Sequence, residues 1–242
     1  MGEIKYLIFD VDNTLLDFDL SLMRTQKTVA DRIGYDFSEE YYMTDRELMY
    51  EAWKEYQMTD TNDLEIQEHW HRHYRMQILR HYELLMERLK MDVDPYELLQ
   101  LNFETISDMH HTMEDETLDV FRELSKTYRT VIATNCVTEI RGRLSIFEPY
   151  CYRIFLSDEI HAIKPTATFF DTVLKSLGCR PEECMMIGDS ATDDMGGGKR
   201  AGLHTCWYKP GIENRVCSDA DYVIQSITEL PALLERISRT SP

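Results

Sequence analysis

Short apolar segments alternate with amphipathic stretches through the second half of this 242-residue chain. Apolar runs of about four residues are typical of strands, and apolar residues repeated at three and four spacing are typical of helices. Strands that alternate with helices form right-handed βαβ units, which build a parallel sheet covered on both faces. We therefore expect strands at 130–133, 153–156, 184–187, 204–207 and near Tyr222, with helices at 115–127, 137–147, 166–177, 193–201 and after Thr228.

One further strand is predicted near the start of the chain, before a long helical block. Residues 4–9 form an apolar run that ends abruptly in acidic residues, as a buried strand does. Residues 17–108 instead repeat apolar positions at helical spacing, with helix-start signals at Ser38 and at Asp94-Pro95. The prediction is an α/β fold, a doubly wound and mostly parallel sheet built from 1–16 and 109–242, with an all-helical domain of at least four helices inserted at 17–108.

The net charge, the apolar runs and the cysteines of the chain limit the kind of molecule that it is expected to bind. The chain has 26 basic and 44 acidic residues, a net charge of −18, which argues against binding a nucleic acid polymer or an anionic membrane surface. The start lacks the pattern of a signal peptide, and no apolar run approaches the length that spans a bilayer. The six cysteines show no C-x-x-C pair, which favours reduced thiols and a cytoplasmic location. We expect a small-molecule partner, and the oligomeric state stays open.

Polar side chains stand where the predicted strands end, the edge at which open α/β sheets collect ligands. They are Asp10 and Asp12 after 4–9, Thr134 and Asn135 after 130–133, Asp189 and Asp194 after 184–187, and Lys164 before the helix at 166–177. Crowded carboxylates repel one another unless a cation lies among them, and a hard divalent ion with oxygen ligands fits that need. We therefore expect Mg²⁺ here, with Lys164 helping to attract a phosphate dianion.

Each of these signals also has a purely structural interpretation. Acidic residues at strand ends are common in turns, and Asp193 is expected to cap the helix at 193–201. The glycines at 196–198 lie inside that helix, so close packing on the sheet is their expected role. The common placement of four short signals at strand ends favours a functional site over four unrelated turns.

Taken in order, these signals resemble the four motifs of the haloacid dehalogenase-like hydrolase superfamily. The motifs are D-x-D-x-T at 10–14, Thr134-Asn135, Lys164-Pro165 and G-D-S-x-x-x-D at 188–194. The resemblance covers 1–16 and 109–242, and it implies a Rossmann-like core. Two positions depart from the usual pattern, because Asn13 and Cys136 stand where glycine is more common. These departures leave the geometry of both loops open.

The resemblance also implies a role for each motif residue. Asp10 would be the nucleophile that accepts the phosphoryl group as an aspartyl phosphate. Asp12 would protonate the leaving oxygen and later activate water. The resemblance assigns phosphate binding to Thr134, Asn135 and Lys164, and magnesium binding to Asp10, Asp189 and the backbone carbonyl of Asp12, with Asp194 in the layer behind them.

Asp12 and the helical block indicate the subclass. A second aspartate two residues after the first is typical of the phosphatases of this superfamily and is lacking in its dehalogenases. A helical insert after the first motif resembles the helical-cap subgroup, subfamily I.

Residues 10–18 and 53–55 most resemble nucleoside 5'-monophosphatases that prefer pyrimidine or non-standard nucleotides. Phosphoglycolate and sugar-phosphate phosphatases and phosphomutases remain alternatives. Residues 17–108 carry 10 basic and 21 acidic residues, which disfavours polyanionic substrates.

Overall fold

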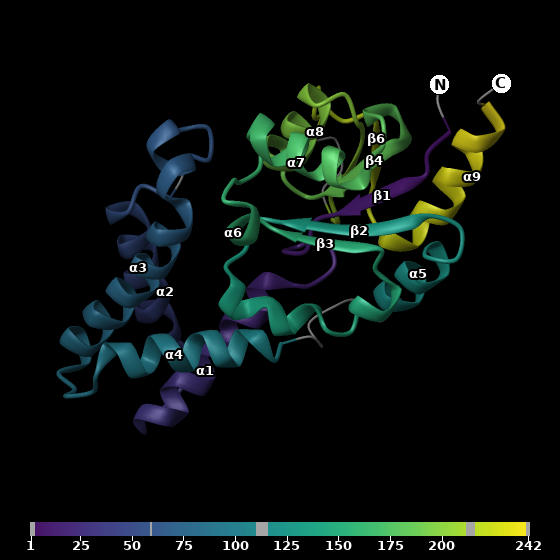
Figure 1. The fold of residues 1–242 in the computed structure, drawn as a ribbon. Helices are drawn as coiled ribbons and strands as arrows, with labels where there is room; N and C mark the ends of the chain where they lie inside the picture. Colours follow the sequence, from purple (N-terminus) through teal and green to yellow (C-terminus); the bar gives the residue numbers. More distant parts are fainter. Residues whose placement is uncertain (1–2, 59, 110–115, 212–215, 241–242) are drawn as a thin grey trace. The chain divides into compact units, whose positions relative to one another are not determined.

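A parallel sheet of six strands in the order β3-β2-β1-β4-β5-β6 forms the centre of the fold (Figure 1). The computed structural model describes residues 3–58, 60–109, 116–211 and 216–240. The strands are β1 (Tyr6–Phe9), β2 (Arg129–Thr134), β3 (Arg153–Leu156), β4 (Cys184–Gly188), β5 (His204–Tyr208) and β6 (Tyr222–Ile224). The predicted doubly wound parallel sheet is confirmed. Its strand order reverses at β1, which pairs with β2 on one side and β4 on the other.

The central strands are buried on both faces, which explains why their sequences are almost continuously apolar. Every residue of β1 and of β4 is buried. In the ladder Ile8 lies between Val131 of β2 and Met186 of β4. This shared register brings the carboxyl ends of β1, β2 and β4 to the same edge of the sheet.

Helices cover the two faces of this sheet, as Figure 1 shows. The helices are α5 (Thr117–Leu124), α6 (Ser157–Ile160), α7 (Ala167–Leu177), α8 (Gly197–Arg200) and α9 (Leu230–Thr240). On the side of α7 and α8, Phe169 and Val173 belong to the same buried cluster as Ile8. On the side of α5, the ring of Phe121 lies 5.1 Å from that of Phe9. Such two-sided burial of a parallel sheet is the arrangement that strand–helix alternation predicts.

One predicted helix takes a different form in the structure, and another is shorter than predicted. The segment predicted as a helix at 137–147 is a 3₁₀ helix, Thr138–Leu144, followed by another at Glu148–Tyr150. Gly142 lowers the helical propensity of this segment, and a Cβ on it would lie 2.3 Å from Ser107 Oγ. The predicted helix at 115–127 is α5, and residue 115 lies outside the described residues.

The predicted helix at 193–201 begins earlier, as a π-helix at Ala191–Gly196 that continues into α8. Its cap is Ser190 and not Asp193, because the Asp193 backbone N–H donates to Ser190 Oγ at 3.0 Å. A Cβ on Gly197 would lie 2.4 Å from the ring of Phe170. The expectation of close packing on the sheet is confirmed for Gly198, where an added Cβ would lie 3.3 Å from Met186 of β4 and from Thr205 of β5, whereas Gly197 packs against α7.

The described residues of the inserted block form four helices. They are α1 (Phe18–Ile33), α2 (Glu39–Glu55), α3 (Leu64–Leu89) and α4 (Pro95–Ser107). Ser38 caps α2 by accepting from the Tyr41 N–H at 3.1 Å, and Asp94 caps α4 with Pro95 in its first turn. Both predicted helix starts are confirmed. Among the helices of the described residues, none is both long and apolar enough to cross a bilayer.

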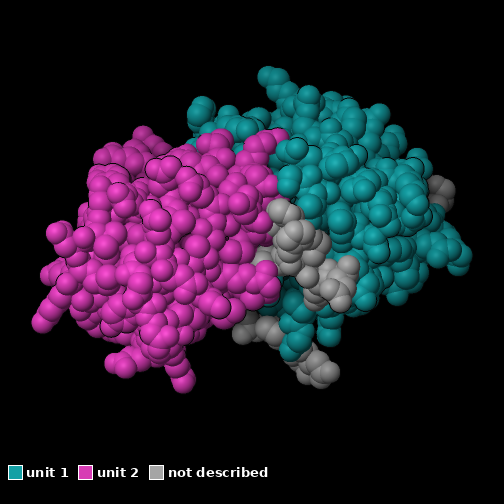
Figure 2. All heavy atoms as spheres, turned by 90° about the horizontal axis from the view of Figure 1, so that it is seen from below, with its two compact units in different colours: residues 1–17, 113–135, 144–242 teal, residues 18–112, 136–143 magenta. Residues whose placement is uncertain are grey.

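The chain divides into two compact units, which Figure 2 colours separately. One holds residues 1–17, 113–135 and 144–242, and the other holds 18–112 and 136–143. Residues 136–143, predicted to belong to the sheet domain, thus group with the helices. Arg75 of α3 makes two hydrogen bonds to the Glu139 carboxylate, at 2.6 and 2.7 Å. The Gly142 N–H donates to Ser107 Oγ of α4 at 3.1 Å.

Candidate active site

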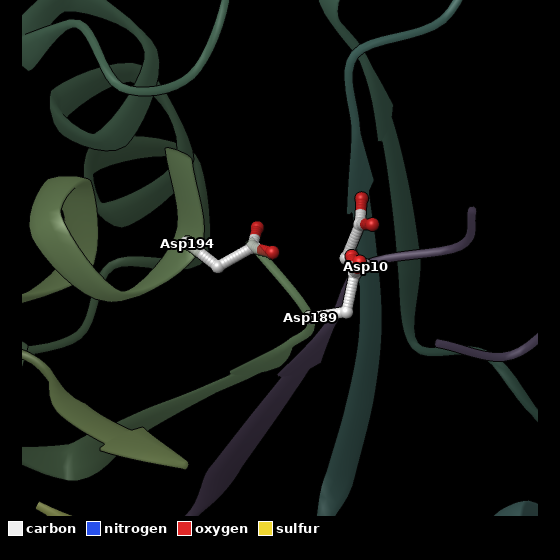
Figure 3. A group of neighbouring side chains, drawn as sticks. All are labelled: Asp10, Asp189 and Asp194. Atoms are coloured by element: carbon white, nitrogen blue, oxygen red, sulfur yellow. The ribbon is translucent and has the colours of Figure 1, made fainter. Parts of the chain in front are cut away.

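Three aspartates gather at one edge of the sheet. Asp10 follows β1, Asp189 follows β4, and Asp194 lies on the π-helix. One carboxylate oxygen of each lies within 4.8 Å of those of the other two. Figure 3 shows the carboxyl group of Asp194 pointing towards the other two. The paired central strands β1 and β4 thus bring together residues that are far apart in sequence.

Lys164 joins this group as a buried cation. Its side chain is 2% exposed, and Nζ donates to Asp10 Oδ1 at 2.5 Å and to Asp194 Oδ1 at 2.7 Å. Burial lowers the pKa of Lys164, but the charges of Asp10 and Asp194 outweigh burial and hold the pKa above its ordinary value. The ammonium therefore stays charged and neutralises part of the acidic group.

Burial and the remaining negative charge raise the pKa values of the three carboxyl groups. Burial raises the pKa of Asp10 to about 7 despite the opposing charge of Lys164, and the charges of Asp194 and Asp12 add to the rise. Burial, with the charges of Asp10 and Asp194, raises the pKa of Asp189 to about 8. Burial also raises the pKa of Asp194. The site thus disfavours its own full ionisation and favours the entry of a further cation.

Local backbone features hold the Asp194 carboxylate in place. The Ser190 N–H donates to Asp194 Oδ2 at 3.0 Å. A Cβ on Gly188 would lie 2.2 Å from that same oxygen, so only glycine leaves room for it there. Ser190 and Gly188 belong to the recognised G-D-S motif, but their positioning roles were not predicted.

Asp189 is held by a residue that the sequence did not indicate. Trp207 of β5 donates from Nε1 to the Asp189 backbone carbonyl at 2.7 Å. β5 runs parallel to β4 with Trp207 opposite Gly188, which brings the indole to this carbonyl. The only sequence signal was its place at the end of a predicted strand.

Asn135 and Thr134 lie at the carboxyl end of β2. The Asn135 side chain accepts from the Lys164 N–H at 2.7 Å and donates to the Lys164 carbonyl at 2.9 Å. Both ends of this amide therefore hold the backbone of the buried lysine. Thr134 is buried as the last residue of β2, the position from which its hydroxyl was predicted to bind phosphate.

The loop after β1 accommodates both Asp12 and Asn13. Asp12 is half-buried and pairs with Leu16 in an isolated bridge. Asn13 has φ of 57°, the left-handed region in which asparagine replaces glycine most readily. Among the described residues with positive φ, Cys136 is not found, so cysteine fits the second loop without that strain. Both departures from the usual motif thus have a structural explanation.

The donor set fits a divalent cation. Three carboxylates with raised pKa values lie close together, Lys164 contacts two of them, and all the candidate ligands are hard oxygen atoms. Mg²⁺ takes such ligands together with water and substrate phosphate oxygens. Among the described residues, Asp10, Asp189 and Asp194 are the acidic side chains grouped closely enough to hold it, and Asp194, predicted to lie in the layer behind the ligands, also contacts Lys164.

Known proteins are similar to this chain along most of its length. The haloacid dehalogenase-like hydrolase family matches residues 4–202. The chain is 29% identical to the pyrimidine 5'-nucleotidase PynA of Streptococcus pneumoniae (strain ATCC BAA-255 / R6), over 96% of this chain and 95% of that protein. It is 26% identical to the glyceraldehyde 3-phosphate phosphatase of Pyrococcus furiosus (strain ATCC 43587 / DSM 3638 / JCM 8422 / Vc1), over 99% and 95%.

A solved structure shares the fold. The magnesium-bound HAD-hydrolase YfnB from Bacillus subtilis superposes with a TM-score of 0.78 at 23% identity, covering 96% of this chain and 99% of that one. The family match extends over most of the chain, including all four motifs. The chain is therefore an enzyme that belongs to the haloacid dehalogenase-like hydrolases.

Proposed function

We propose that this protein is a magnesium-dependent phosphomonoesterase that acts through an aspartyl phosphate on Asp10. The observation that carries the proposal is the contact of Asp10 with Lys164 at 2.5 Å, inside the group that contains Asp189 and Asp194. A buried carboxylate next to a fixed ammonium and a cation site is equipped to approach a phosphate dianion, because phosphoryl transfer needs positioning and charge neutralisation above all.

The reaction proceeds in two steps. Asp10 attacks phosphorus, and the bond from phosphorus to the leaving oxygen breaks as Asp12 delivers a proton to that oxygen. Asp12 then takes a proton from water, which attacks the aspartyl phosphate and releases inorganic phosphate. Thr134 and Asn135 bind the phosphoryl oxygens, while Lys164 holds the Asp10 carboxylate in line. Bound Mg²⁺ supplies charge neutralisation for the phosphate oxygens.

The proposed substrate is a small phosphomonoester, and first among these a nucleoside 5'-monophosphate. The similarity to PynA along nearly the whole chain supports the nucleotide, as does the resemblance of residues 10–18 and 53–55. The similarity to glyceraldehyde 3-phosphate phosphatase keeps sugar phosphates as the alternative. A cytoplasmic location, predicted from the cysteines, agrees with such substrates, and none of the six cysteines is in a disulfide.

The first experiment tests the nucleophile. Purified protein with Mg²⁺ is expected to release phosphate from an aryl phosphate, and chelation of the metal is expected to stop the release. Asp10→Asn is expected to lower kcat by at least about 10³-fold, because the covalent step is lost. Asp171→Asn, which alters an exposed carboxylate on α7, is the matched control and is expected to keep full activity. An active Asp10→Asn protein would overturn the mechanism.

The second experiment identifies the substrate. Nucleoside monophosphates, sugar phosphates and phosphoglycolate are ranked by kcat/KM, and pyrimidine nucleotides are expected to rank first. A sugar 1-phosphate that converts to its 6-phosphate faster than phosphate is released would instead identify a phosphomutase. A higher kcat/KM for sugar phosphates or phosphoglycolate would move the protein to the corresponding phosphatase class.

A further inference from the structure

A cavity of about 840 Å³ opens at the amino edge of the sheet, the edge opposite the aspartates. Its lining includes Lys5 before β1, Arg129 at the start of β2 and Glu183 before β4, together with Cys179. These residues precede their strands, whereas the residues of the candidate active site follow them. The cavity is therefore a separate site within the sheet unit.

Two thiols meet beside this cavity. Cys179 lines the cavity and is partly exposed, whereas Cys184, the first residue of β4, is fully buried. Their sulfur atoms lie 3.3 Å apart. A disulfide needs about 2.05 Å, so the two sulfur atoms have to approach by only ~1.3 Å, a shift on the scale of side-chain rotation.

We propose that Cys179 and Cys184 are a site of reversible oxidation, in which a peroxide that enters the cavity converts the two thiols into an intramolecular disulfide. The accessible Cys179 reacts first. Its sulfur attacks one peroxide oxygen, the O–O bond breaks, and the thiol proton leaves with the displaced oxygen as water, which gives a sulfenic acid.

The buried partner completes the exchange. The sulfur of Cys184 attacks the sulfur of the Cys179 sulfenic acid, the S–O bond breaks, and the hydroxyl leaves with the Cys184 proton as a second water. In total the two thiols lose two electrons and two protons, and one hydrogen peroxide becomes two waters. A dithiol reductant reverses the reaction through thiol–disulfide exchange.

The surroundings set the speed of the first step. Burial raises the pKa of the Cys179 thiol, and the charge of Glu183 adds to the rise, while the hydrogen bond with Cys184 and the charge of Arg129 oppose it. Burial also raises the pKa of Cys184. Because the thiolate is the reactive form, oxidation is expected to be slow near neutral pH and faster in alkaline solution. The short distance between the sulfur atoms then favours the disulfide over further oxidation.

The site is independent of the proposed phosphatase chemistry. Cys184 begins β4 and Asp189 follows its end, which places them about 16 Å apart along a strand that rises ~3.3 Å per residue. Oxidation is therefore expected to change kcat/KM for the aryl phosphate by less than about twofold. The experiment below relies on mass and alkylation, so its result does not depend on whether the protein is a phosphatase.

Full-length reduced protein is treated with hydrogen peroxide in mildly alkaline buffer, denatured, and alkylated with N-ethylmaleimide. Of the six thiols, four are expected to be alkylated after oxidation, and all six after subsequent dithiothreitol treatment. A protease that cleaves after glutamate cuts between Glu183 and Cys184, so the disulfide appears as two linked peptides.

Three variants decide the outcome. Cys179→Ser is expected to form no disulfide, and Cys184→Ser is expected to stop at a sulfenic acid that dimedone traps. Cys217→Ser, which removes another half-buried thiol, is the matched control and is expected to form the disulfide as the unaltered protein does. The proposal is overturned if the unaltered protein loses thiols without linked Cys179 and Cys184 peptides, or if both thiols remain alkylated while other cysteines oxidise.

Discussion

The side-chain amide of Asn135 holds the backbone of Lys164 at both its N–H and its carbonyl, at 2.7 and 2.9 Å. Lys164 in turn donates to Asp10 and Asp194. The residue after β2 therefore fixes the cation that fixes the proposed nucleophile. This is a role for Asn135 in addition to the phosphate contact that its motif implies.

Asn135→Ala is expected to lower kcat by about 10- to 100-fold, the usual effect of losing a residue that orients a ligand or a charged group. KM is expected to change less, and the acid limb of the kcat profile is expected to shift to higher pH because Lys164 no longer holds Asp10 ionised as firmly. Steady-state kinetics across pH measures both effects. A variant that loses only stability and keeps the unaltered pH profile would contradict this role.

Mg²⁺ is expected to stabilise the protein more strongly as pH rises. The pKa values of Asp10 and Asp189 are raised from 3.8 to about 7 and about 8, so the folded metal-free protein keeps protons that the unfolded chain has released. Its stability therefore falls as pH rises from about 4 to about 8, and metal binding, which needs ionised carboxylates, opposes that loss. Thermal unfolding with saturating Mg²⁺ is expected to give a Tm increase of about 5 to 10 °C at pH 8 and a smaller one at pH 6.

Asp189→Asn is the control for that measurement. Removing this carboxyl group is expected to raise the Tm of the metal-free protein at pH 8, because a buried group with a raised pKa opposes folding once it must ionise. The same variant is expected to lose most of the Mg²⁺-induced increase. Equal responses of both proteins to Mg²⁺ would exclude Asp189 as a ligand.

Gly188→Ala is expected to lower kcat/KM by at least about 100-fold, because the new Cβ would lie 2.2 Å from Asp194 Oδ2 and displace that carboxylate. Gly196→Ala is the matched control, since the atom nearest its added Cβ is the end of the Arg200 side chain at 3.3 Å. Kinetics and Mg²⁺ titration of both variants make the comparison. Similar losses in the two variants would show that the Asp194 position is not the cause.

Glu183 is expected to support stability in acid. Lys5 donates to it at 2.7 Å and the Arg180 N–H donates at 2.9 Å, and these contacts lower its pKa from 4.5 to about 2. A lowered pKa contributes stability above the unfolded value that is lost as pH falls from about 5 to about 2. Glu183→Gln is expected to flatten the decline of urea stability over this range, whereas Glu182→Gln, on the neighbouring exposed residue, leaves it unchanged. Parallel curves for the Glu183 variant and the unaltered protein would refute this.

The fold could be predicted from the sequence because local patterns determine most of it. Apolar runs placed every strand within two residues of its observed bounds, and Ser38 and Asp94 marked helix starts through hydrogen bonds to their own neighbours. The segment at 137–147 was the exception. Its periodicity is helical, but Gly142 and a close approach to Ser107 favour a 3₁₀ helix.

The sequence by itself determined which acidic residues follow which strands, because the local pattern of apolar residues predicts where each buried strand begins and ends. Only the tertiary structure decided that Asn135 holds Lys164, that Trp207 holds Asp189, and that residues 136–143 group with the helices. These contacts join residues that are distant along the chain, and they depend on strand order and register. The periodicity of apolar residues predicts which helix or strand a residue belongs to. The packing of that helix or strand against its neighbours decides which residues the side chain contacts.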